Sequence, residues 1–280
     1  MSAQQLPQVP FGPYKISRLI LGDNPIHGGS HLSRFVNVQM RRYFSPRQVL
    51  ALLAACEREG INLWQTNLSL LDIFQRHRRA GGNLQFISLA YDDPQNPDCV
   101  ERLAKAGALG LAHHGEVTDM LFKQGRLEEA RDFLRKVHDA GLLVGVSTHM
   151  PAVVEYIESK GWDIDFYMTC VYERHRTAEE MKALLGYVPI PLGEVYLRED
   201  PSRMFAAMRR TPKPCLAFKI LAAGRLSDAP TLVEEAFRET FRQIKPTDAV
   251  IIGMYPKYED QVAINAGFVR QFSPLSGGVG

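Results

Sequence analysis

The chain has 280 residues, of which 45% are hydrophobic and 23% are charged, and its formal net charge is +2. These are ordinary values for a globular protein, and the length allows two modest domains or one large α/β barrel. A nearly neutral chain gives no reason to expect nucleic acid or an anionic membrane as a partner. We therefore expect the partner to be a small-molecule substrate.

The cysteine pattern favours a reducing compartment. Cys56, Cys99, Cys170 and Cys215 form no C-x-x-C pair, and a chain of this size does not need disulfides to fold. The first residues lack the basic start and apolar run of a signal peptide. No apolar stretch approaches the roughly 20 residues that span a bilayer. These features predict a cytoplasmic protein.

Eight short runs rich in leucine and β-branched residues alternate with amphipathic segments along the chain. Nearly continuous apolar runs are typical of parallel strands that are covered on both faces. We predict strands over 16–22, 61–67, 84–90, 109–114, 142–149, 165–172, 215–221 and 249–254.

The segments between these runs carry helix signals. The clearest helix has Ser45 as its N-cap, Pro46 at its first position and Gly60 just past its end. The long helical pattern over 117–141 is expected to divide at Gly125. Further helices are predicted over 97–107, 151–161, 200–211, 231–244 and 258–271, and the segment 70–79 has the weakest signals.

This alternation of strand and helix predicts the fold class. Repeated eight times, it indicates a (β/α)8 barrel, which we expect to form a single domain over 1–280. The competing open, doubly wound sheet would carry a glycine-rich phosphate turn after its first strand, and "GDNPIHGG" does not match that pattern. The connection 173–200 exceeds normal loop length, so we expect it to serve as a lid or binding element.

Polar residues follow most of the predicted strands. In a barrel of this type the chemistry lies at the C-terminal strand ends. Imidazole and carboxylate groups there are suitable ligands for zinc, manganese or iron. The alternative role for the same groups is general acid–base catalysis. The predicted metal ligands are Asp23, His27, His113, His149 and Glu173, and the predicted catalytic residues are His113, His149, Tyr172, Glu173 and Lys219.

Two of these positions pose a question of orientation. His113 and His114 are adjacent on a strand, so their side chains point to opposite faces and only one can face the site. Lys219 lies in the apolar run "CLAFKIL", where an unpaired charge is costly to bury. It either pairs with Glu173 or Asp23 or acts as an amine with a lowered pKa.

Several segments resemble the aldo/keto reductase superfamily. These are "KISRLILG", "ACEREGINLWQTN", "ALGLAHH" and "AVIIGMYPKYEDQVAINAG". The resemblance implies a (β/α)8 barrel that reduces carbonyls with NADPH, using an aspartate, a tyrosine, a lysine and a histidine. Only the histidine carries over, to His113 or, one residue later, His114. The other three positions hold Gln65, Leu70 or Leu71, and Ala90 or Tyr91.

The resemblance also bears on a cofactor. If NADPH binds, Gly224, Arg225 and Lys257 would be the surviving contacts, but the missing tetrad does not favour this cofactor. Barrel register and resemblance together favour His113 as the histidine that faces the site.

The leading hypothesis is an enzyme on an aldo/keto reductase-like barrel without the reductase tetrad. It would act on a small carbonyl or sugar-like substrate as a lyase, isomerase or hydrolase, with the assistance of a divalent metal if one binds. The first alternative is an atypical NADPH-dependent reductase, with Tyr91 or Tyr172 as the substitute acid. The second is a ligand-binding barrel without catalysis, and either form can be a homo-oligomer.

Overall fold

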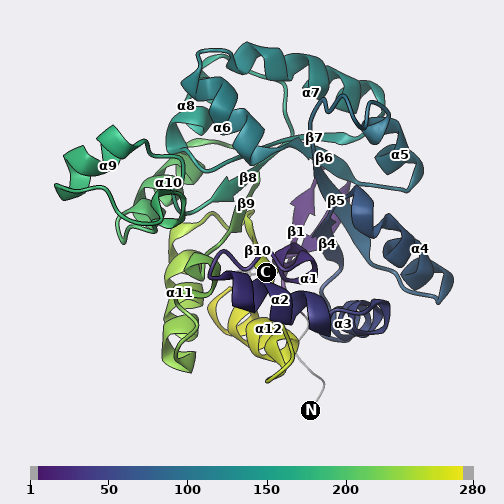
Figure 1. Ribbon diagram of the computed structural model, residues 1–280. Coiled ribbons are helices and arrows are strands. Elements are labelled where there is room, and N and C mark those ends of the chain that lie inside the picture. The colour runs from purple at the N-terminus through teal and green to yellow at the C-terminus, as the bar shows by residue number, and fades with distance from the viewer. Residues whose placement is uncertain (1–5, 274–280) are drawn as a thin grey trace, which may run out of the picture.

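Eight parallel strands close into a barrel in the computed structural model, which describes residues 6–273 (Figure 1). Each strand pairs with its neighbours in chain order, and the last pairs with the first. The barrel strands are β3 (Leu19–Gly22), β4 (Leu63–Thr66), β5 (Gln85–Ala90), β6 (Gly110–His113), β7 (Leu143–Thr148), β8 (Phe166–Cys170), β9 (Cys215–Phe218) and β10 (Ala249–Gly253). All eight predicted strands and the closed single-domain barrel are confirmed.

Helices surround the barrel, as Figure 1 shows. They are α3 (Pro46–Arg58), α4 (Leu71–Arg79), α5 (Cys99–Lys105), α6 (Gly115–Lys123), α7 (Ala130–Asp139), α8 (Pro151–Ser159), α10 (Asp200–Arg210), α11 (Pro230–Gln243) and α12 (Gln261–Phe272). The Ser45 side chain caps α3 by accepting a hydrogen bond from the Gln48 backbone, as predicted. Gly125 has a φ of +69° and separates α6 from α7, so the predicted division is confirmed.

An antiparallel hairpin closes the N-terminal end of the barrel. It consists of β1 (Gln8–Phe11) and β2 (Tyr14–Ser17). The Phe11 ring packs edge-on against Phe166, with 4.8 Å between the ring centroids. Sequence analysis missed this hairpin and assigned 16–18 to the first barrel strand. Because the hairpin seals this end, a substrate site must open at the opposite end, which we call the mouth.

Alternation along the strands sorts side chains into two layers. The interior layer includes Ile20, Ile87 and Ala112, whereas Leu111 packs in the layer between strands and helices. Gly145 belongs to this packing because a Cβ atom there would lie 2.3 Å from the Phe166 ring. The inward position of Ala112 fixes the directions of the two residues that follow it.

Two insertions lie beside the mouth. The first follows β3 and holds α1 (Asn24–His27) and α2 (Arg34–Tyr43). The second is residues 173–199, which we call the arm; it holds α9 (Ala178–Leu185) and a 3₁₀ turn over Leu192–Glu194. Figure 1 shows α9 projecting from the barrel wall. The expected long loop is therefore partly helical, and its service as a lid stays a prediction.

All four cysteines are buried and have free thiols. Within residues 6–273, every helix is too short or too polar to cross a bilayer.

Candidate functional site

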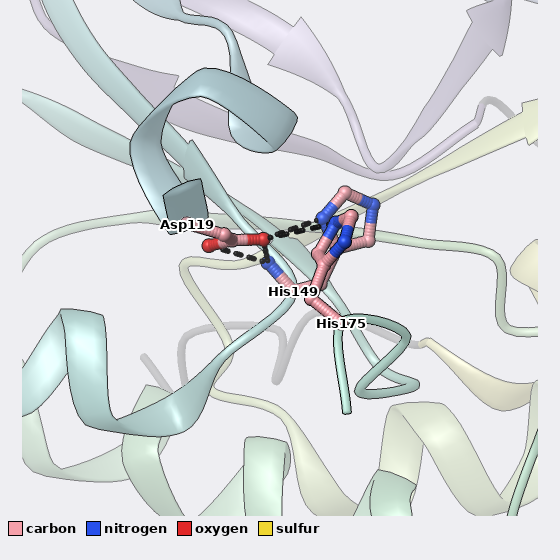
Figure 2. A group of neighbouring side chains, drawn as sticks. All are labelled: Asp119, His149 and His175. Atoms are coloured by element: carbon pink, nitrogen blue, oxygen red, sulfur yellow. Dashed lines mark hydrogen bonds and ion pairs between the residues drawn. The ribbon is translucent and has the colours of Figure 1, made fainter. Parts of the chain in front are cut away.

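One buried carboxylate and two imidazoles meet at the mouth (Figure 2). Asp119 comes from α6, His149 directly follows β7, and His175 comes from the arm. The Nδ1 atom of His149 lies 2.8 Å from Oδ2 of Asp119, and Nε2 of His175 lies 3.4 Å from the same oxygen. The two imidazole rings are nearly perpendicular, with 4.8 Å between their centroids. Three segments far apart in the sequence thus meet at one carboxylate.

Local hydrogen bonds hold this carboxylate in place. Asp119 is fully buried, and it accepts hydrogen bonds from the Thr148 hydroxyl and from the His149 backbone nitrogen, the latter at 3.0 Å. Gly115, in the first turn of α6, allows the close approach, since a Cβ atom there would lie 2.9 Å from Oγ of Ser147. The chain therefore fixes the carboxylate before any substrate arrives.

Electrostatics define the protonation states of the pair. Burial raises the pKa of Asp119 to about 6, opposed by the hydrogen bonds from Thr148 and His149, so the carboxylate is mostly ionised at pH 7. Burial lowers the pKa of His149 well below 6.5, and the positive charge of Lys219 acts in the same direction. His149 is therefore neutral at pH 7. Its Nδ1–H donates to Asp119, which leaves the Nε2 lone pair free to accept a proton.

The prediction that His113 faces the mouth is wrong. Its side chain lies under a helix, with Nδ1 2.7 Å from the Thr118 hydroxyl and its ring 5.4 Å from that of Phe133 on α7. Burial lowers its pKa to about 4. The cause is register: Ala112 points inward, so His113 points outward. His114 is the member of the pair that turns toward the mouth.

Charges around the mouth support this assignment of His114. Among the groups that perturb its pKa are Lys219 and Asp23, which follow β9 and β3, so it lies within electrostatic reach of the opposite wall. Its Nδ1 atom is buried and has no hydrogen-bond partner within residues 6–273. Burial lowers its pKa. His114 is therefore a neutral imidazole with a free nitrogen.

Lys219 stands at the mouth without a counter-ion. It follows β9 directly and has a φ of +61°, a conformation rarely adopted by large side chains. In the described part of the chain, no carboxylate lies within 4.0 Å of its ammonium, so the predicted ion pair with Glu173 or Asp23 is wrong. Burial lowers its pKa, and nearby Arg174 adds to this. The alternative expectation, an amine with a lowered pKa, agrees with this direction.

Four other predicted residues lie outside the cluster. Asp23 and His27 form a pair of their own, with 3.4 Å between Oδ2 and Nε2, and the Asn67 amide lies within hydrogen-bond distance of both. Glu173 pairs with Arg176 and Arg203 at 3.1 and 2.6 Å, which anchors the arm.

Tyr172 packs under the arm, with 5.1 Å between its ring centroid and that of Tyr196. Burial raises its pKa to about 12, so its hydroxyl is protonated at neutral pH.

A cavity of about 410 Å³ opens beside Lys219. It runs between the ends of β9 and β10, α2 and α12, with Gln65 and Asp23 at the barrel end. Asp119, His149 and His175 do not line it, but Phe218 does, and its ring lies 5.6 Å from that of His149. Lys219 and Phe218 therefore stand between the cavity and the histidine cluster.

The residues predicted to hold NADPH do not form a phosphate site. Gly224 lines the cavity, but Arg225 stacks on Tyr196 at 4.1 Å and donates to the carbonyl oxygens of His31 and Glu194. Lys257 is exposed and lies outside the lining. Arg225 is engaged by these contacts and Lys257 lies outside the lining, so the three residues do not gather at one phosphate site, which agrees with the expectation that NADPH is not favoured.

The cluster of Asp119, His149 and His175 is a better candidate site for a divalent metal than the five predicted ligands are. Of the five predicted ligands, only His149 belongs to the group of three. The ligand atoms of Asp119, His149 and His175 lie within 4.8 Å of one another, and Nε2 of His175 is buried without a hydrogen-bond partner. Two imidazoles and one carboxylate are a common donor set for zinc, manganese or iron.

Sequence reasoning missed Asp119, His175 and the orientation of His114. Asp119 lies inside a predicted helix and His175 in a segment without a predicted element. One sequence signal could have indicated Asp119. This carboxylate precedes apolar Met120 and Leu121, near the start of the helix that follows the strand ending in His113.

Comparison with known proteins establishes the fold. No family model matches the chain, and no curated protein sequence matches it. A truncated 3-deoxy-D-arabino-heptulosonate 7-phosphate synthase from Thermotoga maritima is similar with a TM-score of 0.54 at 12% identity, over 95% of this chain and 91% of that chain. The glycerol dehydrogenase AKR11B4 from Gluconobacter oxydans is similar with a TM-score of 0.50 at 13% identity, over 99% and 91%.

Identities this low show the (β/α)8 barrel alone. The likeness to aldo/keto reductases therefore stays a resemblance.

Proposed function

We propose that the protein is an enzyme that transfers a proton next to the carbonyl group of a small carbonyl or sugar-like substrate, as an isomerase or lyase. One observation carries the proposal: buried Asp119 fixes neutral His149 at 2.8 Å, and Lys219 stands unpaired at the same mouth. A positioned base and a free cation are the two groups that enolate formation requires. Both solved structures named above are also enzymes on this fold.

Each side chain has a defined role in this proposal. His149 accepts the substrate proton at Nε2, and Asp119 stabilises the imidazolium that forms. The Lys219 ammonium stabilises the negative charge that develops on the carbonyl oxygen. In a substrate with a hydroxyl on the deprotonated carbon, transfer of the hydroxyl proton to the carbonyl oxygen and return of the abstracted proton to the former carbonyl carbon complete an isomerisation. In an elimination, the enolate re-forms the carbonyl group and expels a leaving group from the carbon beyond the deprotonated one, and the His149 imidazolium protonates that leaving group. A hydrolase would use the same base on water.

Proton exchange tests the proposal without knowledge of the natural product. Dihydroxyacetone, pyruvate, phenylpyruvate and 4-hydroxyphenylpyruvate are incubated with the protein in D₂O, and loss of the C–H signal is followed by NMR. We expect at least one probe to exchange faster with protein than in buffer alone. Exchange at the buffer rate for all four would contradict the proposal.

A metal-dependent form of the same function is the second candidate. Its specific support is His175, whose unpartnered Nε2 points at the carboxylate oxygen that His149 contacts. Asp119, His149 and His175 would hold a divalent ion, which would polarise the substrate carbonyl. The positive charges of Lys219 and Arg174 act on His149 and oppose a further cation there. We therefore rank this candidate second.

Elemental analysis separates the two candidates. For protein purified without a histidine tag, we expect far less than one equivalent of zinc, manganese or iron by mass spectrometry. We also expect exchange activity to survive dialysis against EDTA. A stoichiometric metal that is lost in His175→Ala, together with loss of activity in EDTA, would establish the metal-dependent form instead.

A further inference from the structure

We propose that the cavity beside Lys219 binds the body of a largely apolar 2-oxo acid, and that it does not bind NADPH. The carbonyl head would lie at Lys219, and a hydrogen-bonding group on the body of the ligand would meet Asn265 on α12. The identity of the head group rests on the proposed function, whereas the shape and chemistry of the remaining cavity do not.

The size of the cavity indicates a substrate larger than a triose. Its volume of about 410 Å³ lies within the range of roughly 300–1,000 Å³ that is typical of sites for drug-sized ligands. The rest of the lining is mainly apolar and includes Val36 and Met40 on α2, Val233 on α11, and Phe268 on α12. Such walls favour a ring or an aliphatic chain rather than a hydroxylated sugar.

Two polar residues of the lining have amide groups that the protein leaves largely free. Asn265 is 5% exposed and lines the cavity, and its side-chain amide makes no hydrogen bond to any residue within 6–273. At the barrel end, Gln65 is 8% exposed and makes only a 3.4 Å contact with the adjacent Thr66 carbonyl. Neither amide is a fully buried group without a partner; both line the cavity, where polar groups of a ligand can pair with them.

The charges of the lining oppose a dinucleotide phosphate. Two basic side chains of the lining are Lys219 and His31. Burial lowers the pKa of His31, and the nearby cations Lys219 and Arg174 act in the same direction, so this imidazole is neutral at pH 7. At the outer end, Glu259 adds negative charge, and the Asp260 carboxylate already accepts the Ala263 backbone N–H at the start of α12. A 2′-phosphate is normally met by an arginine or other cation. The single negative charge of a ligand carboxylate, placed at Lys219, suits this lining better than the several phosphate charges of a dinucleotide.

Calorimetric titration of the full chain tests the proposal with four ligands: pyruvate, phenylpyruvate, 4-hydroxyphenylpyruvate and NADPH. We expect 4-hydroxyphenylpyruvate to bind at least tenfold more tightly than pyruvate, and NADPH to bind more weakly than either aromatic acid. Asn265→Leu should raise the Kd of 4-hydroxyphenylpyruvate about three- to tenfold, the effect of losing one hydrogen bond. It should leave the Kd of phenylpyruvate, which lacks the hydroxyl, nearly unchanged.

Two further variants complete the test. Gln271→Leu makes the same amide-to-leucine change at an exposed position of α12 and should alter no Kd. Val36→Trp narrows the cavity from α2 and should weaken both aromatic acids without affecting pyruvate, which covers the case in which Asn265→Leu fails to fold.

The proposal is overturned if the three 2-oxo acids bind equally, if NADPH binds most tightly, or if neither Asn265→Leu nor Val36→Trp changes binding. Aromatic acids that bind as expected but do not exchange protons would refute the proposed function and leave this inference standing. Fast proton exchange of pyruvate without tighter binding of the aromatic acids would refute this inference and leave the proposed function standing.

Discussion

His149→Gln is expected to lower kcat for proton exchange by about 10²–10⁴-fold, the usual contribution of a positioned general base. Glutamine keeps a polar side chain of similar reach but has no basic nitrogen. The KM should change much less, because His149 does not line the cavity beside Lys219. The measurement is the NMR exchange rate as a function of substrate concentration.

The matched control is His138→Gln. His138 lies near the end of α7 with its side chain 71% exposed, so the same substitution there should leave kcat unchanged. Thermal unfolding of each variant separates lost catalysis from lost structure. A folded His149→Gln protein with wild-type kcat would remove His149 from the mechanism and direct attention to His114.

Lys219→Met is expected to lower kcat by about 10²–10³-fold, the range measured when one group that stabilises an oxyanion is removed. Methionine retains most of the side-chain volume and lacks the charge. The variant should be no less stable than the wild type, because removing a buried cation without a counter-ion relieves a desolvation cost. Exchange kinetics and urea unfolding measure the two effects.

The pH profile gives this prediction a second readout. Because burial lowers the pKa of Lys219 below 10.5, wild-type activity should fall as the pH rises through that lowered value. On the acid side, activity should fall as the pH drops through about 6, where Asp119 takes up a proton and no longer stabilises the imidazolium. His149 itself does not set this limb, because its own pKa is lowered well below 6.5. Lys219→Met should lose the alkaline limb.

Lys219→Arg should restore part of the rate and move the alkaline limb upward, because a guanidinium keeps its charge to higher pH. Lys182→Met, at an exposed position of α9, should change neither rate nor profile. An unchanged alkaline limb in the Lys219→Met protein would show that another group titrates there.

The architecture could be predicted from local sequence patterns. The eight apolar runs and the signals at Ser45 and Gly125 are local, so each could be recognised from neighbouring residues. Their strict alternation then favoured a closed barrel, because few topologies accommodate eight successive strand–helix units. His149 and Lys219 were found by the same means, since a residue directly after a barrel strand must lie at the mouth.

Which side chains meet at the site depends on long-range packing that the sequence does not show. Asp119 lies within a helix and His175 within the arm, and both meet His149 because three separate connections converge at one strand end. The error at His113 has a similar origin. A shift of one residue in strand register exchanges the inward and outward faces, and the packing of Ala112 in the barrel interior fixes that register. Local sequence does not contain such long-range distances, so it predicted the position of the mouth but not the pairing of its side chains.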